Sequence, residues 1–188
     1  MASLRAAIPR WLEDAENGLT DRFRALLHGL WDDLLTLDQR IEALNREVDC
    51  IAKNDPVAQR LQQLRGVGPL VATALIARVG NGDQFSTGRQ MAASMGLTPR
   101  QHSSGGKDRL LGISKRGDAY LRGILIHGAR AVVSQAKHKE DRLSRWVSEL
   151  AERRHPNVAA VALANKTVRI AWAMMNHDAD YDPEFAVS

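Results

Sequence analysis

A chain of 188 residues is long enough for one compact domain with an appendage or for two small domains, which excludes a large multidomain machine. Its 44% hydrophobic and 26% charged residues are ordinary for a globular protein, and no apolar run approaches the roughly 20 residues that span a bilayer, so we expect no membrane association. The N-terminus lacks the apolar core of a signal peptide, and the single Cys50 cannot form an intrachain disulfide, which together favour the bacterial cytoplasm.

The net charge of +4 is distributed unevenly along the chain. Residues 13–55 carry 5 Lys and Arg against 11 Asp and Glu, a net charge of −6. Residues 98–130 carry seven basic residues against Asp108 and Asp118, a net charge of +5. The first segment therefore repels phosphate groups, whereas the second attracts them.

In the acidic segment, apolar residues recur at alternating spacings of three and four. The positions are Leu27, Leu30, Leu34, Leu37, Ile41, Leu44, Val48 and Ile51. This spacing is typical of a coiled-coil seam, although a single amphipathic helix lying on its own domain gives a similar pattern over this length. We expect residues 1–55 to form an N-terminal segment and a coiled-coil arm that makes homo-oligomers, and Asn54-Asp55-Pro56 to end the arm.

The segment 56–80 reads as a helix, a tight Gly66-Val67-Gly68-Pro69 turn and a second helix, an arrangement that resembles a helix-hairpin-helix. In that motif the glycines let the backbone approach a phosphate, and free amides at the start of the second helix point at it. The alternative is an ordinary helical hairpin in which Gly66 and Gly68 only permit the turn. These residues alone leave both interpretations open.

Glycines, serines and basic residues fill residues 98–117, with few apolar ones among them. A core element does not have this composition, so we expect a long ordered loop or a short hairpin of the kind retained for function. Helices are predicted on both sides of it, at about 89–96, 119–136, 139–154 and 157–175. The fold class is therefore all-α, with a compact domain over residues 56–176 and a flexible tail over 177–188.

Two adjacent serines, Ser103 and Ser104, precede two glycines in this basic segment. A serine becomes a nucleophile only where its proton is removed and the developing charge is stabilised. Neighbouring Lys107, Arg109, Lys115 and Arg116 are suited to neutralise a phosphate under attack. By composition alone, however, Ser-Ser-Gly-Gly is more simply a flexible turn.

Other polar residues carry weaker signals. His102 is a poor general base for the adjacent serine, because neighbouring residues of a strand point apart. His127 lies in an apolar helix and is expected to be packed. Arg153-Arg154 and the pair Lys166 and Arg169 are interpreted as solvated helix faces. No His or Cys cluster has the spacing of a metal site, so we predict no metal ligands and no cofactor in this chain.

Three sequence features together resemble one family of mobile-element proteins. They are the Gly66-Val67-Gly68-Pro69 turn, the Gln84-Phe85 pair, and the block GLTPRQHSSGGKDRLLGISKRGDAYLR over residues 96–122. The resemblance is to insertion-sequence transposases of the one-ten type, in particular their eleven-eleven subgroup. It extends from about residue 15 to about residue 175.

The resemblance implies a role for each of these segments. It implies that Ser104 is the nucleophile on DNA and that a structured guide RNA pairs with donor and target DNA, so that the protein reads mainly backbone and shape. The residues expected to contact nucleic acid are Gly66, Gly68, Arg100, Lys107, Arg109, Lys115, Arg116 and Arg122. Family members also carry an N-terminal RNase-H-like domain whose carboxylates bind magnesium, and these 188 residues contain no such segment.

Two functions follow as expectations. In the first, the chain is the DNA-binding C-terminal part of a transposase, equipped with Ser104 but inactive in recombination without the acidic domain. In the second, it is a non-catalytic module that binds nucleic acid and dimerises, a remnant or regulator of a full-length transposase. A serine hydrolase of small molecules is excluded for want of a nucleophile elbow or a plausible triad.

Overall fold

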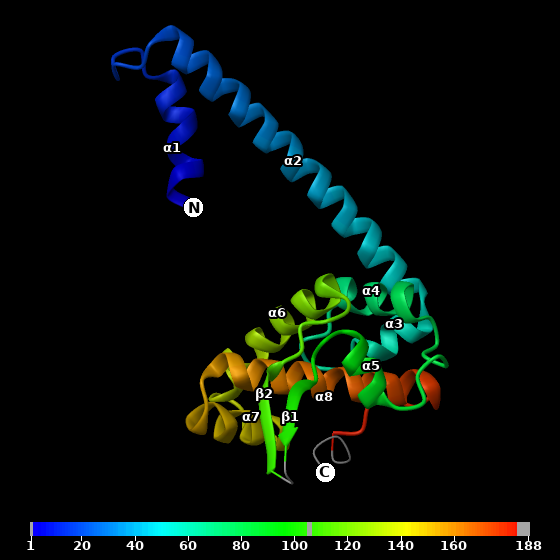
Figure 1. The fold of residues 1–188 in the computed structure, drawn as a ribbon. Helices are drawn as coiled ribbons and strands as arrows, with labels where there is room; N and C mark the ends of the chain where they lie inside the picture. Colours follow the sequence, from blue (N-terminus) through cyan, green and yellow to red (C-terminus); the bar gives the residue numbers. More distant parts are fainter. Residues whose placement is uncertain (1, 105–106, 184–188) are drawn as a thin grey trace. The chain divides into compact units, whose positions relative to one another are not determined.

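The computed structural model describes residues 2–104 and 107–183, with side chains described except at 2–3, 102–104 and 107–110. The chain divides into two units, Met1–Glu47 and Val48–Ser188. The described residues form eight helices and one two-stranded sheet, so the predicted all-α class is confirmed (Figure 1). The elements are α1 (Ala2–Glu13), α2 (Asp21–Asn54), α3 (Pro56–Leu61), α4 (Pro69–Val79), α5 (Gly88–Ser94), β1 (Pro99–Ser104), β2 (Lys107–Ile113), α6 (Ala119–Ala136), α7 (Arg142–Arg153) and α8 (Pro156–Asn176).

The first unit consists of α1 and most of α2. Helix α1, which the sequence did not predict, is tied to the loop after it and to α2 by polar contacts. The Arg24 guanidinium donates to the carbonyl oxygens of Trp11 and Leu12 at 2.9 and 2.8 Å, and Arg5 forms an ion pair with Asp38. These contacts fix the start of α2.

Helix α2 confirms that the heptad segment is one continuous helix of 34 residues. Its apolar stripe lies largely in solvent in the single chain. Five of the eight positions are at least half exposed: Leu30, Leu37, Ile41, Leu44 and Ile51. Whether this stripe pairs with another copy remains a prediction, since only one chain is described.

Helix α2 ends at Asn54, and the residues that follow it start a new helix, α3. Asp55 caps α3 because its carboxylate accepts from the backbone N–H groups of Val57 and Ala58 at 2.8 and 3.0 Å, and Pro56 occupies the first turn. The division between the two units falls within α2, between Glu47 and Val48. The last turns of α2 belong to the second unit, where Ala52 is buried.

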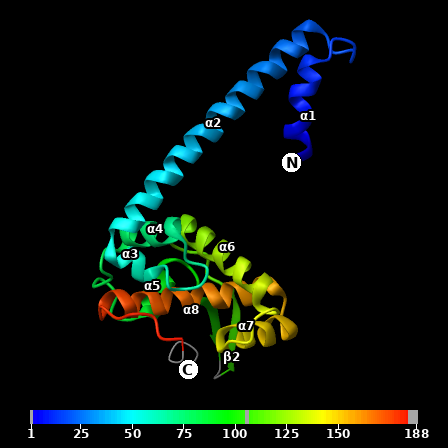
Figure 2. The ribbon, with the colours of Figure 1, turned by 180° about the vertical axis from the view of Figure 1, so that it is seen from behind.

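The second unit packs its helices around α8. Helices α5, α6, α7 and α3 all contact α8 (Figures 1 and 2). Small side chains on α8, including Ala160, Ala164 and Ala171, are fully buried and let the neighbouring helices approach closely. Larger side chains such as Leu75, Met91 and Leu121 fill the remaining space.

Helix α8 has the length and composition of a membrane-spanning helix, with a mean hydropathy of 1.2 over 18 residues. Its packing accounts for this composition. Half of that window is buried against the other helices of the second unit, as expected for the core helix of a compact domain.

Residues 177–183, the first part of the segment predicted to be a flexible tail, contact α3 and the residues that follow it. The backbone N–H of Tyr181 donates to Gln63 Oε1 at 2.9 Å, and Gln63 donates to Asp180 Oδ1 at 3.1 Å. Arg60 forms an ion pair with Asp178. These contacts could not be predicted from sequence, because their partners lie more than 110 residues apart. The remainder of the expected tail, 184–188, lies outside the described residues.

Candidate nucleic-acid interface

The basic segment 98–117 forms an antiparallel hairpin, the second of the two forms expected for it. Strands β1 and β2 pair with Pro99 opposite Ile113, and a register shift between Pro99 and Gln101 leaves Arg100 in an irregular position. Arg100 is exposed there. The strands run side by side away from α5 and α6 (Figure 1).

The base of the hairpin is bound tightly to the junction of α5 and α6. The backbone N–H groups of Ser114, Lys115 and Asp118 donate to the carbonyls of Thr98, Gly96 and Ser94 at 2.9, 3.2 and 3.1 Å. A Cβ on Gly117 would lie 1.8 Å from the Ser94 carbonyl oxygen, and one on Gly96 would lie 2.1 Å from that of Arg116. Both glycines have positive φ, so only glycine fits at either position.

The pairing register groups the polar positions of the two strands. Ser104 lies opposite Lys107, and His102 lies opposite Arg109, whereas Ser103 lies opposite Asp108. Because positions two apart on a strand belong to the same face, Ser104 shares its face of the ladder with His102, Lys107 and Arg109. The side chains of these residues lie outside the described part of the structure, so the grouping concerns backbone positions only.

The basic residues at the hairpin base divide into two groups. Lys115 and Arg116 are exposed, and Lys115 adopts a φ of 56°, which is unusual for a non-glycine residue and marks the tight turn at the hairpin's exit. Arg122, also expected to contact nucleic acid, is half-buried and donates to the Met95 carbonyl oxygen at 3.1 Å. Arg122 therefore joins α6 to the end of α5, a structural role that its sequence position did not indicate.

The two glycines of the predicted helix-hairpin-helix have different surroundings. Gly66 has a φ of 80°, and a Cβ there would lie 2.9 Å from the carbonyl group of Gly128 on α6, so this glycine permits close helix packing. Gly68 has open space around its Cβ position and precedes the first turn of α4, where no side chain caps the free amides. The phosphate contacts predicted for Gly66 and Gly68 stay predictions; an amide at that turn is the kind of group that binds a phosphate.

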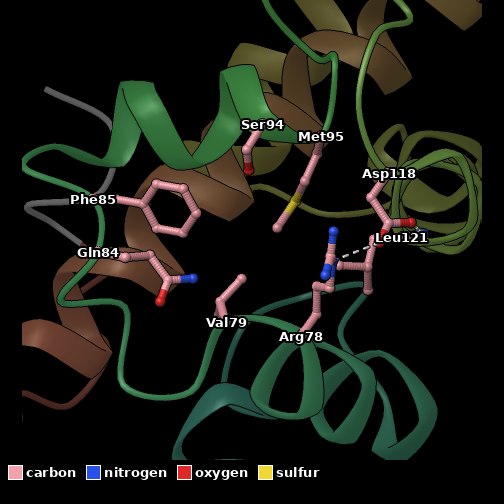
Figure 3. Close-up of a pocket in the computed structure, with 8 residues that line it drawn as sticks. All are labelled: Arg78, Val79, Gln84, Phe85, Ser94, Met95, Asp118 and Leu121. Carbon is pink, nitrogen blue, oxygen red and sulfur yellow. Dashed lines mark hydrogen bonds and ion pairs between the residues drawn. The ribbon is translucent and has the colours of Figure 1, made fainter.

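A pocket of about 220 Å³ lies beside the hairpin base, between the end of α4 and the start of α6 (Figure 3). Arg78 reaches across it to Asp118, with 3.1 Å between Nε and Oδ2. Asp118 also caps α6, accepting from the Leu121 backbone N–H at 2.9 Å. The Arg78 contact was not predicted, because Arg78 reads in the sequence as the polar end of an apolar helix.

The exposure of His127 corrects one further expectation. His127 is exposed on α6 rather than packed, because the apolar face of that helix is carried by Leu121, Leu125 and Ala129. Among residues 2–104 and 107–183, no group of three His, Cys, Asp or Glu side chains is placed to hold a metal ion.

Comparison with known proteins agrees with the resemblance. The family model for IS116/IS110/IS902 transposases matches residues 58–144, which include the α3–α4 turn, the hairpin and α6. A probable family 20 transposase of Pseudomonas aeruginosa is 52% identical over 84% of this chain and 47% of its own length.

Two other relatives are transposases of named insertion sequences. That of IS1111A from Coxiella burnetii is 45% identical over 93% of this chain and 48% of its own length. The transposase of IS1328 from Yersinia enterocolitica is 43% identical over 73% of this chain and 41% of its own length. The chain thus spans about half the length of the curated relatives it matches, and it belongs to the IS116/IS110/IS902 family of insertion-sequence transposases.

Proposed function

We propose that this chain is a DNA-binding part of an insertion-sequence transposase and that Ser104 attacks a phosphodiester of the bound DNA. The observation that carries the proposal is the hairpin, whose register groups Ser104 with two cationic positions and whose base is locked to the helical core. The fixed base defines where the two strands leave the core, and the rate of a nucleophilic attack depends strongly on the position of the reacting group.

The proposed reaction is a transesterification. A bond forms between Ser104 Oγ and phosphorus, a bond between phosphorus and a deoxyribose oxygen breaks, and the serine proton passes to a base and finally to the departing sugar oxygen. The cationic positions Lys107 and Arg109 on the same face are suited to stabilise the added negative charge of the transition state. No oxidant, reductant or nucleotide cofactor is required.

The resemblance implies a second set of catalytic groups, four magnesium-binding carboxylates, and the described residues do not provide a site for them. We propose that these carboxylates come from an RNase-H-like domain elsewhere in the assembled transposase. A structured guide RNA is proposed as the source of sequence selection. The α2 stripe is proposed to join protomers so that the two sets of groups meet.

Ser104 is tested by replacing the matching half of a full-length relative, such as the IS1111A transposase, with this chain and assaying strand cleavage. We expect Ser104→Ala to lower cleavage by about 10³-fold or more, with DNA affinity unchanged. Ser103→Ala is the matched control and should retain most activity, because its position faces Asp108. If Ser104→Ala cleaves normally, the non-catalytic module becomes the better function.

A further inference from the structure

A second basic surface lies away from the hairpin, in a groove between the start of α5 and the C-terminal half of α8. The groove encloses about 810 Å³ and is closed on one side by residues 179–182. The residues that the inference uses are Arg89, Lys166, Arg169, Trp172, His177 and Tyr181. Its position and composition differ from those of the pocket in Figure 3, which lies beside the hairpin base.

Three cations are gathered at one end of this groove. Arg89 and Arg169 are exposed, and neither forms an ion pair with any carboxylate of the described residues. The pKa of Lys166 is lowered by partial burial and then by the neighbouring charges of Arg169 and Arg142. Cations crowded in this way are stabilised when an anion binds among them.

The close packing of α5 on α8 brings the cations near one another. A Cβ on Gly88 would lie 2.8 Å from the Arg169 carbonyl oxygen, so this glycine lets the two helices meet where Arg89 and Arg169 emerge. Lys166 Nζ lies 5.3 Å from the centre of the Trp146 ring, which holds the ammonium group at the groove's edge. Arg89 and Arg169 therefore emerge beside the point where α5 and α8 meet, and the Trp146 ring positions Lys166.

Aromatic side chains occupy the rest of the lining. Trp172 is fixed, because its Nε1 donates to the Phe85 carbonyl oxygen at 3.1 Å and its ring meets that of His177 edge-on at 5.8 Å. Tyr181 is half-buried, and burial raises the pKa of its hydroxyl. The lining also holds two carboxylates, Asp180 and Asp182. Asp180 accepts from Gln63 and lies 3.9 Å from Arg60 Nε, so its charge is partly offset.

The groove is joined to the hairpin by α8. Asn165 Nδ2 donates to the Leu97 carbonyl oxygen at 3.2 Å, immediately before β1. The next residue, Lys166, begins the groove lining, which continues along α8 to His177. The contact therefore places the residues before β1 against the helix that carries Lys166 and Arg169.

We infer that the α5–α8 groove binds an unpaired stretch of nucleic acid, with phosphates on Arg89, Lys166 and Arg169 and bases against Trp172 and Tyr181. Aromatic faces take up bases only when these are free of a duplex, which makes a single strand the fitting ligand. The inference rests on the proposed binding of DNA at the hairpin. It assigns a further site to residues whose sequence reads as a solvated helix face.

The test measures fluorescence anisotropy of the chain with labelled oligo-dT and oligo-rU of about 12 nucleotides and with a duplex of equal length. Arg89→Glu/Arg169→Glu should weaken single-strand binding by about tenfold or more. Arg145→Glu/Arg154→Glu, the same charge change on exposed residues of α7 and its end, is the matched control. Equal affinity of the groove and control variants would overturn the inference.

The two single strands distinguish the possible sources of the ligand. Equal losses with dT and rU indicate recognition of phosphate and base alone, whereas a loss confined to rU indicates contacts to the 2′-hydroxyl. Either result supports the groove. A cross-link from 5-iodouracil to the peptide holding Trp172 or Tyr181 checks the site in the unmodified chain, and cross-linking only to other peptides contradicts it.

A hairpin variant separates failure of this inference from failure of the proposed function. Arg100→Glu/Arg116→Glu should weaken duplex binding. If it does so while the groove variant keeps full single-strand affinity, only the groove assignment is wrong. If the hairpin variant binds duplex normally, the proposed function itself is wrong.

Discussion

At the scale of single residues, Asp141 illustrates how one carboxylate joins distant segments. Its Oδ2 accepts from Arg65 at 2.8 Å and from the fully buried Ser144 hydroxyl at 2.7 Å, and its Oδ1 caps α7 through the Ser144 N–H. Partial burial opposes its ionisation, but the hydrogen bonds from Ser144 and the charge of Arg65 outweigh burial and lower the pKa from 3.8 to about 2.

We expect Asp141→Asn to destabilise the fold by about 1 kcal/mol at pH 7, since asparagine retains the cap but loses the charge and the side chain is over a third exposed. The folded pKa lies below the unfolded one, so the stabilisation is complete above about pH 5 and is lost as pH falls toward 2. Urea unfolding should show the variant and wild type converging near pH 2. Glu140→Gln, at the exposed neighbour, should show no such pH dependence; a constant difference for Asp141→Asn would contradict the assignment.

The two turn glycines give a second prediction at this scale. Gly66→Ala should cost about 2 kcal/mol or more, because its Cβ meets the Gly128 backbone and its φ is positive. Gly68→Ala should cost less than about 1 kcal/mol, because its Cβ enters open space. Thermal unfolding measures both, and duplex binding of Gly68→Ala tests the phosphate contact. Equal destabilisation by the two changes would show that the Gly66–Gly128 packing matters little.

The caps at Asp55 and Asp118 could be predicted from sequence, because a cap is a local signal formed within three residues. The packing of Gly66 on Gly128 and the contact of Arg122 with Met95 could not. Each depends on how helices distant in sequence meet. For the same reason, the structural contacts of Gly66 and Arg122 could not be foreseen when both were predicted to contact nucleic acid.

At the scale of elements, the hairpin and α2 show what periodicity can and cannot decide. The heptad spacing predicted one long helix correctly, since a helix needs only local hydrogen bonds. For residues 98–117, the composition predicted either a loop or a hairpin and did not decide between them. Strand pairing there depends on the register between two segments and on backbone anchoring at Gly96 and Gly117, neither of which composition encodes.

The exposed stripe of α2 makes a prediction about self-association. Leu37→Glu places a charge in the proposed seam and should shift the chain from oligomer to monomer in sedimentation equilibrium, with helix content of the second unit unchanged. Gln39→Glu adds the same charge two positions away, off the seam, and should leave the oligomer intact. A monomeric wild-type chain would show that the stripe does not join copies.

At the scale of the whole molecule, charge is the property that sequence conveys best. The acidic first segment and the basic middle fall on different elements, α2 and the hairpin with α6. The groove along α8 was missed, because Arg89, Lys166 and Arg169 lie up to 80 residues apart and only packing gathers them.

Duplex affinity should fall with salt by about 0.9 log units per log unit of salt for each phosphate neutralised. Arg100→Gln should reduce this slope by about 1, whereas His127→Gln, on the exposed face of α6, should leave it unchanged. Titrations at several salt concentrations measure the slope. A salt-independent affinity would argue against backbone contacts as the source of binding.

The locked base of the hairpin has a consequence for its length. Because both strands leave the core at fixed points, added residues extend the ladder outward by about 3.3 Å per residue pair without disturbing α5 or α6. Two added pairs keep every position on its original face, whereas one added pair turns the outer positions over. The hairpin is therefore an adjustable spacer: insertions in steps of two pairs should change how far Ser104 reaches while preserving which neighbours accompany it.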